Sequence, residues 1–143
     1  MEAHTSESYQ RAKDELMRFL ENDPPDADAG DAWRLLGHAC YQTGDTHGEI
    51  HAFVERSQVC NMPFYDLSNT ANRLNQFSND RRSKFAEEEK HDLADRLLSV
   101  LDARRKEAGS ADLARMAWLA LNVGQESKAR DYVQTGILID PGD

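Results

Sequence analysis

Glycine and proline occur in short clusters that divide the chain into segments of about 13 to 25 residues, and this punctuation limits the fold more than any other feature. The segments between the clusters are rich in Ala, Leu, Glu, Arg and Lys, which favour helix. None shows sustained alternation of β-branched residues, the pattern typical of a strand. The sequence therefore predicts an all-α chain. The clusters are DPPDADAG (23–30), TGD (43–45), NMP (61–63), AGS (108–110), VGQ (123–125) and DPGD (140–143).

Apolar residues at three- and four-residue spacing place about seven helices between these clusters. Connections of roughly 2 to 8 residues are typical of antiparallel neighbours. We expect Gly30 or Asp31 to cap the second helix, and ordered helix in the fifth from about residue 84. Because residues 80–91 are highly charged, the alternative there is a mobile loop. The predicted helices cover 6–22, 31–43, 46–60, 64–78, 83–107, 111–123 and 126–139.

Two of the apolar stripes give specific expectations for the core. A stripe with helical periodicity faces the interior of a helical protein. The first helix should bury Tyr9, Ala12, Leu16, Phe19 and Leu20. The fifth should bury Leu93, Leu97, Val100 and Leu101.

The charge balance excludes several classes of function. The 143 residues contain 17 Lys and Arg against 26 Asp and Glu, a formal net charge of -9. A general nucleic-acid or anionic-membrane binder needs a basic face, so neither partner is expected. The longest wholly apolar stretches are only a few residues, too short to cross a bilayer.

Cysteine and histidine do not form a recognisable metal or disulfide pattern. In a hairpin that turns near Gly44, Cys40 and Cys60 lie too far apart along their helices to form a disulfide. His47 and His51 have a spacing that can bind zinc, but no third ligand is near in sequence. We therefore expect no cofactor or metal, and a reducing, cytoplasmic setting.

One segment carries the pattern of a known repeat. AWRLLGHACYQTGD (32–45) places a Trp, a Leu-Gly pair, a Tyr and a Gly-Asp turn at Trp33, Leu36, Gly37, Tyr41, Gly44 and Asp45. It resembles the first helix of a tetratricopeptide repeat (TPR), a helix–turn–helix repeat. Phe53 stands where the family has its large aromatic residue. Glu49 and Arg56 stand where it has small ones, so the second helix is divergent.

The two ends of the chain resemble other parts of the same repeat. In the last thirty or so residues the turn, the small, aromatic and second small places and the terminal proline fall on Gly124, Ala129, Val133, Gly136 and Pro141. Residues 10–24 resemble a second helix, with Ala12, Leu16 and Pro24 at matching places and Phe19 in place of a small residue. In the middle, Leu67, Ala71 and Leu74 keep the spacing of a first helix, but the turn after them lacks glycine.

The resemblance implies a right-handed α-solenoid of antiparallel helix pairs. Its parts would be an N-terminal half repeat (1–24), a linker (25–30), a TPR-like pair (31–63), a divergent pair with a long second helix (64–109) and a TPR-like pair (110–143). The alternative is a plain helical bundle. A free solenoid ends in a polar capping helix, and none follows Pro141. We therefore expect either a fragment of a longer protein or self-association through the uncapped end.

TPR arrays bind peptides or partner helices on the concave face, so the resemblance implies a non-enzymatic protein–protein interaction module. Asn and Gln can bond an extended backbone, Arg can clamp a carboxylate, and Trp and Tyr supply anchoring area. The alternative for each residue is ordinary surface, or core for Trp118. The expected concave-face residues are Arg34, His38, Tyr41, Gln42, Ser68, Asn72, Asn75, Gln76, Trp118 and Asn122.

Two other functions stay open. The chain could be a scaffold or regulatory segment that packs against a catalytic domain of a larger enzyme. It could also be a compact bundle with its own cleft. No phosphate loop, nucleophile elbow or metal motif supports catalysis by the chain itself.

Overall fold

A computed structural model describes residues 2–78 and 85–140, with side chains from residue 7 onward. Within these ranges the chain is all-helical, with seven α-helices and no strand. None of the described helices is long and apolar enough to cross a membrane. The chain forms two compact units, residues 1–61 and 62–143, and each is described by itself.

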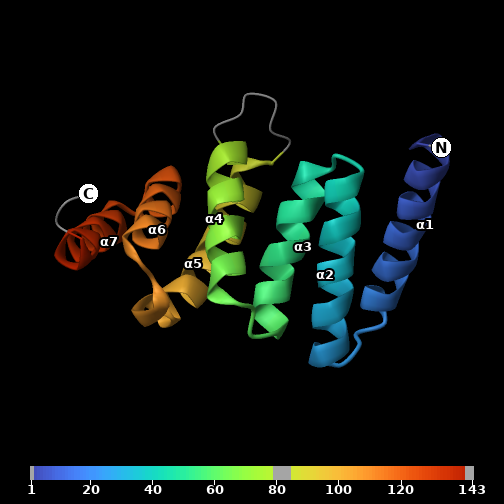
Figure 1. Ribbon diagram of the computed structural model, residues 1–143, viewed down its shortest axis with the longest axis horizontal. Helices are drawn as coiled ribbons and strands as arrows, with labels where there is room; N and C mark the ends of the chain where they lie inside the picture. Colours follow the sequence, from blue (N-terminus) through green and yellow to red (C-terminus); the bar gives the residue numbers. More distant parts are fainter. Residues whose placement is uncertain (1, 79–84, 141–143) are drawn as a thin grey trace. The chain divides into compact units, whose positions relative to one another are not determined.

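The first unit is built around α2 (Asp26–Gln42), which packs on α1 (Glu2–Glu21) and on α3 (Thr46–Val59) (Figure 1). Its core contains Leu36, Cys40 and Ala52, and Leu16, Leu20 and Trp33 pack against them. Tyr9, Ala12, Leu16 and Leu20, which the stripe on α1 predicts as buried, are only half-buried. Phe19, placed on the same stripe, is instead exposed.

The second helix begins five residues earlier than predicted. Pro25 is its N-cap, and the Ala29 amide donates to the Pro25 carbonyl at 2.8 Å. Residues 26–30 are therefore the first turns of α2 and not a linker, and neither Gly30 nor Asp31 is the cap. Gly30 is buried against α3, where an added Cβ would lie 3.1 Å from Cys60 Cβ. The glycine allows a close helix approach, and Asp26 and Asp28 suit the positive end of the helix dipole.

Two glycines shape the α2–α3 hairpin. Gly37 lies beside the ring of Phe53, with only 3.1 Å between its missing Cβ position and two ring carbons. A side chain at residue 37 would displace that ring, so the two helices depend on a small residue here. Gly44 has φ +75°, a value that favours glycine and lets the chain turn in three residues.

The second unit contains α4 (Phe64–Ser78), α5 (Glu87–Ala103), a short 3-10 helix (Arg105–Glu107), α6 (Ser110–Asn122) and α7 (Glu126–Ile139). α6 packs on α7 and on α4, and α5 packs on α4 and α6 (Figure 1). Gly124 turns the chain between α6 and α7 with φ +77°. The largest fully buried side chains in this unit are Met62, Leu67, Leu74, Leu93, Leu97, Leu98, Leu101, Leu113, Met116, Leu119 and Tyr132.

The fifth helix is shorter than predicted. α5 has 17 residues and starts at Glu87, and the predicted start at residues 83–84 lies outside the described residues. Phe85 precedes the helix and is buried edge-on against Phe77, with ring centroids 5.1 Å apart. Leu98 and Ala94 complete the buried stripe of α5, whereas the predicted Val100 is only half-buried.

Two arginines tie the end of α5 to the rest of the unit. Arg104 donates to the Met62 carbonyl and stacks over the Phe64 ring, 5.7 Å from its centroid. Arg105 donates to Asp131 and Thr135 of α7, both at 2.9 Å. These contacts link the end of α5 to the start of α4 and to α7.

Candidate functional site

The four predicted site residues of the first unit all lie on exposed positions of α2. Arg34, His38, Tyr41 and Gln42 are each accessible to solvent. Tyr41 does not enter the core, where Cys40 is buried in its place. Their spacing places them along one side of the helix, so α2 presents a mixed polar and aromatic edge.

The predicted site residues of the second unit divide into two groups. Ser68 is 1% exposed and Asn75 is 8% exposed, so neither can lie on a surface that contacts a ligand. Asn72 and Asn122 are half-buried, Gln76 is exposed, and Trp118 is 60% exposed. The exposure of Trp118 excludes the alternative of a core residue.

Ser68 and Asn75 hold α4 against α6. Ser68 Oγ donates to Asp112 Oδ1 at 2.6 Å and accepts from Arg115 at 3.0 Å. Asn75 Nδ2 donates to the Arg115 carbonyl at 3.0 Å, and its Oδ1 accepts from Asn122 Nδ2 at 2.9 Å. Both side chains use their donor and acceptor atoms for hydrogen bonds between α4 and α6, because buried polar groups need partners. The expected peptide contacts at these two residues are therefore wrong.

The helices α6 and α7 share an apolar surface. Of its residues, only Trp118 was predicted from the sequence as a binding residue. The exposed stripe of α6 consists of Ala111, Ala114, Trp118 and Leu121, without a charged or polar side chain. These residues recur at three- and four-residue steps and so share one side of the helix. Exposed Val133 and Ile137 of α7 adjoin the same side. We call these six residues the α6–α7 surface.

A hollow lies at one end of the α6–α7 surface. Its lining residues are Ser110, Ala111 and Ala114 of α6, Tyr132, Val133, Gly136 and Ile137 of α7, and Asp140. Its volume of about 290 Å³ is at the lower limit of small-molecule pockets. It is also open and its surface is mainly apolar, which fits a protruding side chain better than a polar metabolite.

Tyr132 fixes α7 in this orientation. The sequence placed the buried aromatic position at Val133, but Val133 is exposed and Tyr132 is buried. The Tyr132 hydroxyl donates to Asp102 Oδ1 at 3.0 Å, and Arg105 stacks over the ring. Burial, and then the neighbouring Asp102 carboxylate, raise the pKa of Tyr132 above its usual range, so it stays a neutral donor.

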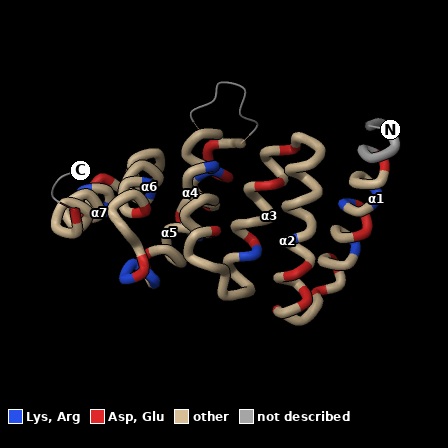
Figure 2. Tube along the Cα trace, viewed as in Figure 1, with Lys and Arg blue, Asp and Glu red and all other residues tan. Residues whose placement is uncertain are grey.

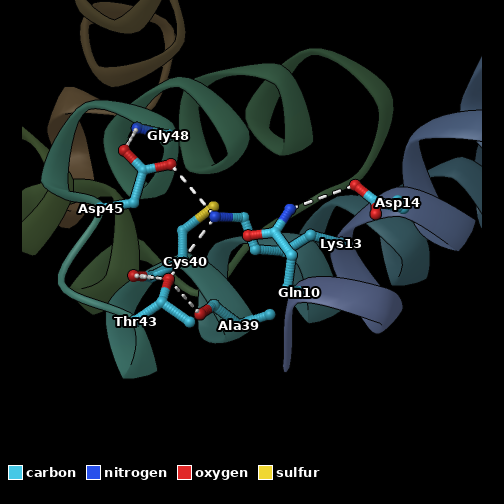
Figure 3. A network of polar contacts seen from close by, with 8 residues as sticks. All are labelled: Gln10, Lys13, Asp14, Ala39, Cys40, Thr43, Asp45 and Gly48. Carbon is cyan, nitrogen blue, oxygen red and sulfur yellow. Dashed lines mark hydrogen bonds and ion pairs between the residues drawn. The ribbon is translucent and has the colours of Figure 1, made fainter. Parts of the chain in front are cut away.

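A polar cluster joins all three helices of the first unit (Figure 3). The Lys13 ammonium lies 3.4 Å from Asp45 Oδ2 and 3.5 Å from Thr43 Oγ1. Asp45 also caps α3 by accepting from the Gly48 amide at 3.0 Å. Burial raises the pKa of Asp45, but the Gly48 N–H and the Lys13 charge outweigh it, so the pKa is lowered.

The thiol in this cluster is not set up as a nucleophile. Burial, and then the charge of Asp45, raise the pKa of Cys40 to about 11, so the thiol is protonated at neutral pH. Cys40 and Cys60 are both free, as the helix geometry predicts. Lys13, Cys40 and Asp45 therefore have a structural role, which is to hold the three helices of the first unit together. In the described part of the chain, no three His, Cys, Asp or Glu side chains are grouped to hold a metal ion.

No protein-family model matches the chain, and no curated protein is detectably similar to it.

Proposed function

We propose that this protein is a non-enzymatic interaction module of TPR-like helix pairs that binds a segment of a partner protein in the cytoplasm. The contact surface is the α6–α7 surface, centred on Trp118. The proposal keeps the interaction role that the sequence predicts. It moves the binding contacts away from Ser68 and Asn75, which are buried.

The observation that carries the proposal is the composition of the exposed stripe of α6. A helix on the surface of a folded protein normally turns charged and polar residues to water. Here all four exposed stripe positions are apolar, and Val133 and Ile137 extend the area onto α7. Contiguous exposed apolar area of this kind is typical of a protein-binding site. Trp118 is a residue type that often dominates binding energy.

Three local features support the TPR-like part of the proposal. Gly37 makes close contact with Phe53, which is the pairing of small and large residues that the repeat requires. Gly44 and Gly124 both adopt positive φ at the turns where the repeat has glycine. Ala129 is buried at the small-residue place of α7. The right-handed solenoid stays part of the proposal.

A peptide-display selection on the immobilised chain tests the binding role. Peptides selected on the wild-type chain should lose at least about tenfold in affinity for Trp118→Ala, because the anchor is removed. Tyr65→Ala is the matched control, since Tyr65 is an exposed aromatic residue of α4 in the same unit. Circular dichroism verifies that both variants fold. Failure to enrich any peptide, or equal binding by Trp118→Ala, would contradict the proposal.

The alternative function is a scaffold or regulatory segment that packs against a catalytic domain of a larger enzyme. Leu138 and Ile139, next to the α6–α7 surface in sequence, are 82% and 54% exposed, and permanent interfaces are more apolar than transient ones. In this case the surface is already covered in the complete gene product. Peptides selected on the isolated chain would then fail to bind that product. Besides a partner segment and a catalytic domain, a second copy of the chain is the third possible occupant of the α6–α7 surface. Light scattering on the isolated chain detects such a dimer.

A further inference from the structure

A second apolar hollow lies in the first unit, between α1 and α2. Ala12 and Leu16 of α1 and Leu35 and Ala39 of α2 line it, and its volume is about 400 Å³. Leu35 is 47% exposed although it is a large aliphatic residue. Exposed Phe19 lies three residues beyond Leu16 on α1 and extends the apolar strip. We call this area the α1–α2 hollow.

The α1–α2 hollow is set in a strongly acidic unit. Residues 1–61 contain 5 Lys and Arg against 12 Asp and Glu, which gives a formal net charge of -7. Residues 62–143 contain 12 against 14, a net charge of -2. The first unit therefore holds most of the excess negative charge of the chain, and acidic residues are visible along α1 and at the start of α2 (Figure 2).

Acidic side chains also flank the hollow itself. Glu15 is part of its lining. Asp31 is exposed and lies four residues before Leu35, so it is on the same side of α2. Among the cations of this unit, Lys13 is already paired with Asp45, Arg11 and Arg18 lie one turn before and after Glu15, and Arg34 lies one turn before His38. A carboxylate thus lies beside the apolar strip on each helix, and the surrounding unit has a net negative charge.

These observations select the kind of occupant. A groove between two helices fits a third helix, which satisfies its own backbone groups. An extended peptide would need regularly spaced backbone partners along its length, and the polar side chains lining the hollow are Tyr9, Glu15 and His38. If a second copy of the chain bound here through its own first unit, two units that each have a net charge of -7 would come together, which Coulomb repulsion disfavours. We propose that the α1–α2 hollow binds an amphipathic helix of another protein, with an apolar stripe flanked by Lys and Arg. This site is separate from the α6–α7 surface and does not depend on it.

A designed peptide tests the proposal directly. The probe is a fluorescein-labelled helix of about 18 residues, or five turns, with a Leu stripe bordered by Lys. Its binding to the full chain is measured by fluorescence anisotropy at about 50 and 300 mM NaCl, which span the range of effective screening. We expect saturable binding that weakens at the higher salt concentration.

Two control peptides separate the apolar and charged contributions. A scrambled peptide has the same composition and charge but no stripe, and a second has Glu in place of Lys. Both should bind at least about tenfold more weakly, since the proposal needs both features. Equal binding of the scrambled peptide would reduce the interaction to general charge attraction and overturn the proposal. Equal binding of the Glu peptide would overturn the basic character of the partner.

Matched variants place the binding on the hollow. Leu35→Asp should weaken binding at least about tenfold, whereas Leu138→Asp, on the exposed side of α7, should not. Glu15→Lys should also weaken it and reduce its salt dependence, whereas Glu88→Lys, on α5 in the other unit, makes the same charge change without effect. Circular dichroism confirms the fold of each variant. Equal effects within either pair would refute the site, even if the α6–α7 surface binds its own peptides.

Discussion

Asn75 offers the sharpest test of the interaction between α4 and α6. Replacement by Ala removes the donor to the Arg115 carbonyl at 3.0 Å and the acceptor for Asn122 Nδ2 at 2.9 Å. Each such bond contributes about 0.5 to 1.5 kcal/mol, so the two together contribute about 1 to 3 kcal/mol. Asn72→Ala is the matched control, because it makes the same substitution one turn earlier on α4, at a half-buried residue. The helix propensity gained by replacing Asn with Ala is common to both variants and cancels.

Urea denaturation followed by far-UV circular dichroism gives the free energy of unfolding of each variant. Because the chain has two compact units, any separate transitions are fitted individually, and the change is expected in one of them. A double-mutant cycle with Asn122→Ala should give a coupling energy of about 0.5 kcal/mol or more. A difference below about 0.5 kcal/mol between Asn75→Ala and Asn72→Ala would refute the assignment of Asn75 to the helix contact.

Three further predictions follow from the contacts of single residues. Tyr132→Ala should lower the free energy of unfolding by about 3 to 5 kcal/mol. Val133→Ala should change it by less than about 0.5 kcal/mol, and a comparable loss at both residues would contradict the buried position of Tyr132. Because burial, and then the charge of Asp45, raise the pKa of Cys40 to about 11, iodoacetamide at about pH 8 should alkylate Cys60 much faster, as mass spectrometry can measure, and equal rates would contradict this. The pKa of Asp45 is lowered because its amide and ammonium partners outweigh burial, so its stabilisation exists at neutral pH and is lost as the pH falls through that lowered pKa. Asp45→Ala should therefore cost about 0.5 to 2 kcal/mol in urea titrations at neutral pH and less once the pH has fallen through that lowered pKa, and a pH-independent cost would argue against it.

Local sequence features were sufficient for the class of the fold and for most of the helices. The predicted helices at 64–78 and 126–139 have the bounds found in α4 and α7. Gly44 and Gly124 mark turns because positive φ is a property of the local backbone. The spacing of apolar residues likewise predicted buried Leu93, Leu97 and Leu101 of α5, but it missed Leu98 and included the half-buried Val100. All of these features depend on residues within a few positions of one another.

The same local signals gave wrong predictions where the structure depends on contacts between residues far apart in the sequence. The sequence predicts a break at Gly30 because glycine weakens a helix, but Gly30 lies inside α2, where Cys60 leaves little room for a side chain. Phe85 is buried by Phe77 before α5 begins, which no charge pattern in residues 80–91 indicated. The burial of Phe85 therefore depends on a tertiary contact that the local charge pattern does not contain.

The candidate site shows most clearly which properties the local sequence determines and which depend on tertiary packing. The sequence by itself determined which residues share a side of each helix, because helical periodicity is a local property. It did not determine which side meets a neighbouring helix. Only the packing of α4 on α6 buried Asn75 and Ser68, and only the anchoring of Tyr132 by Asp102 and Arg105 left Val133 outside. A stripe becomes core or binding surface according to its neighbour, and that neighbour comes from residues far away in the chain.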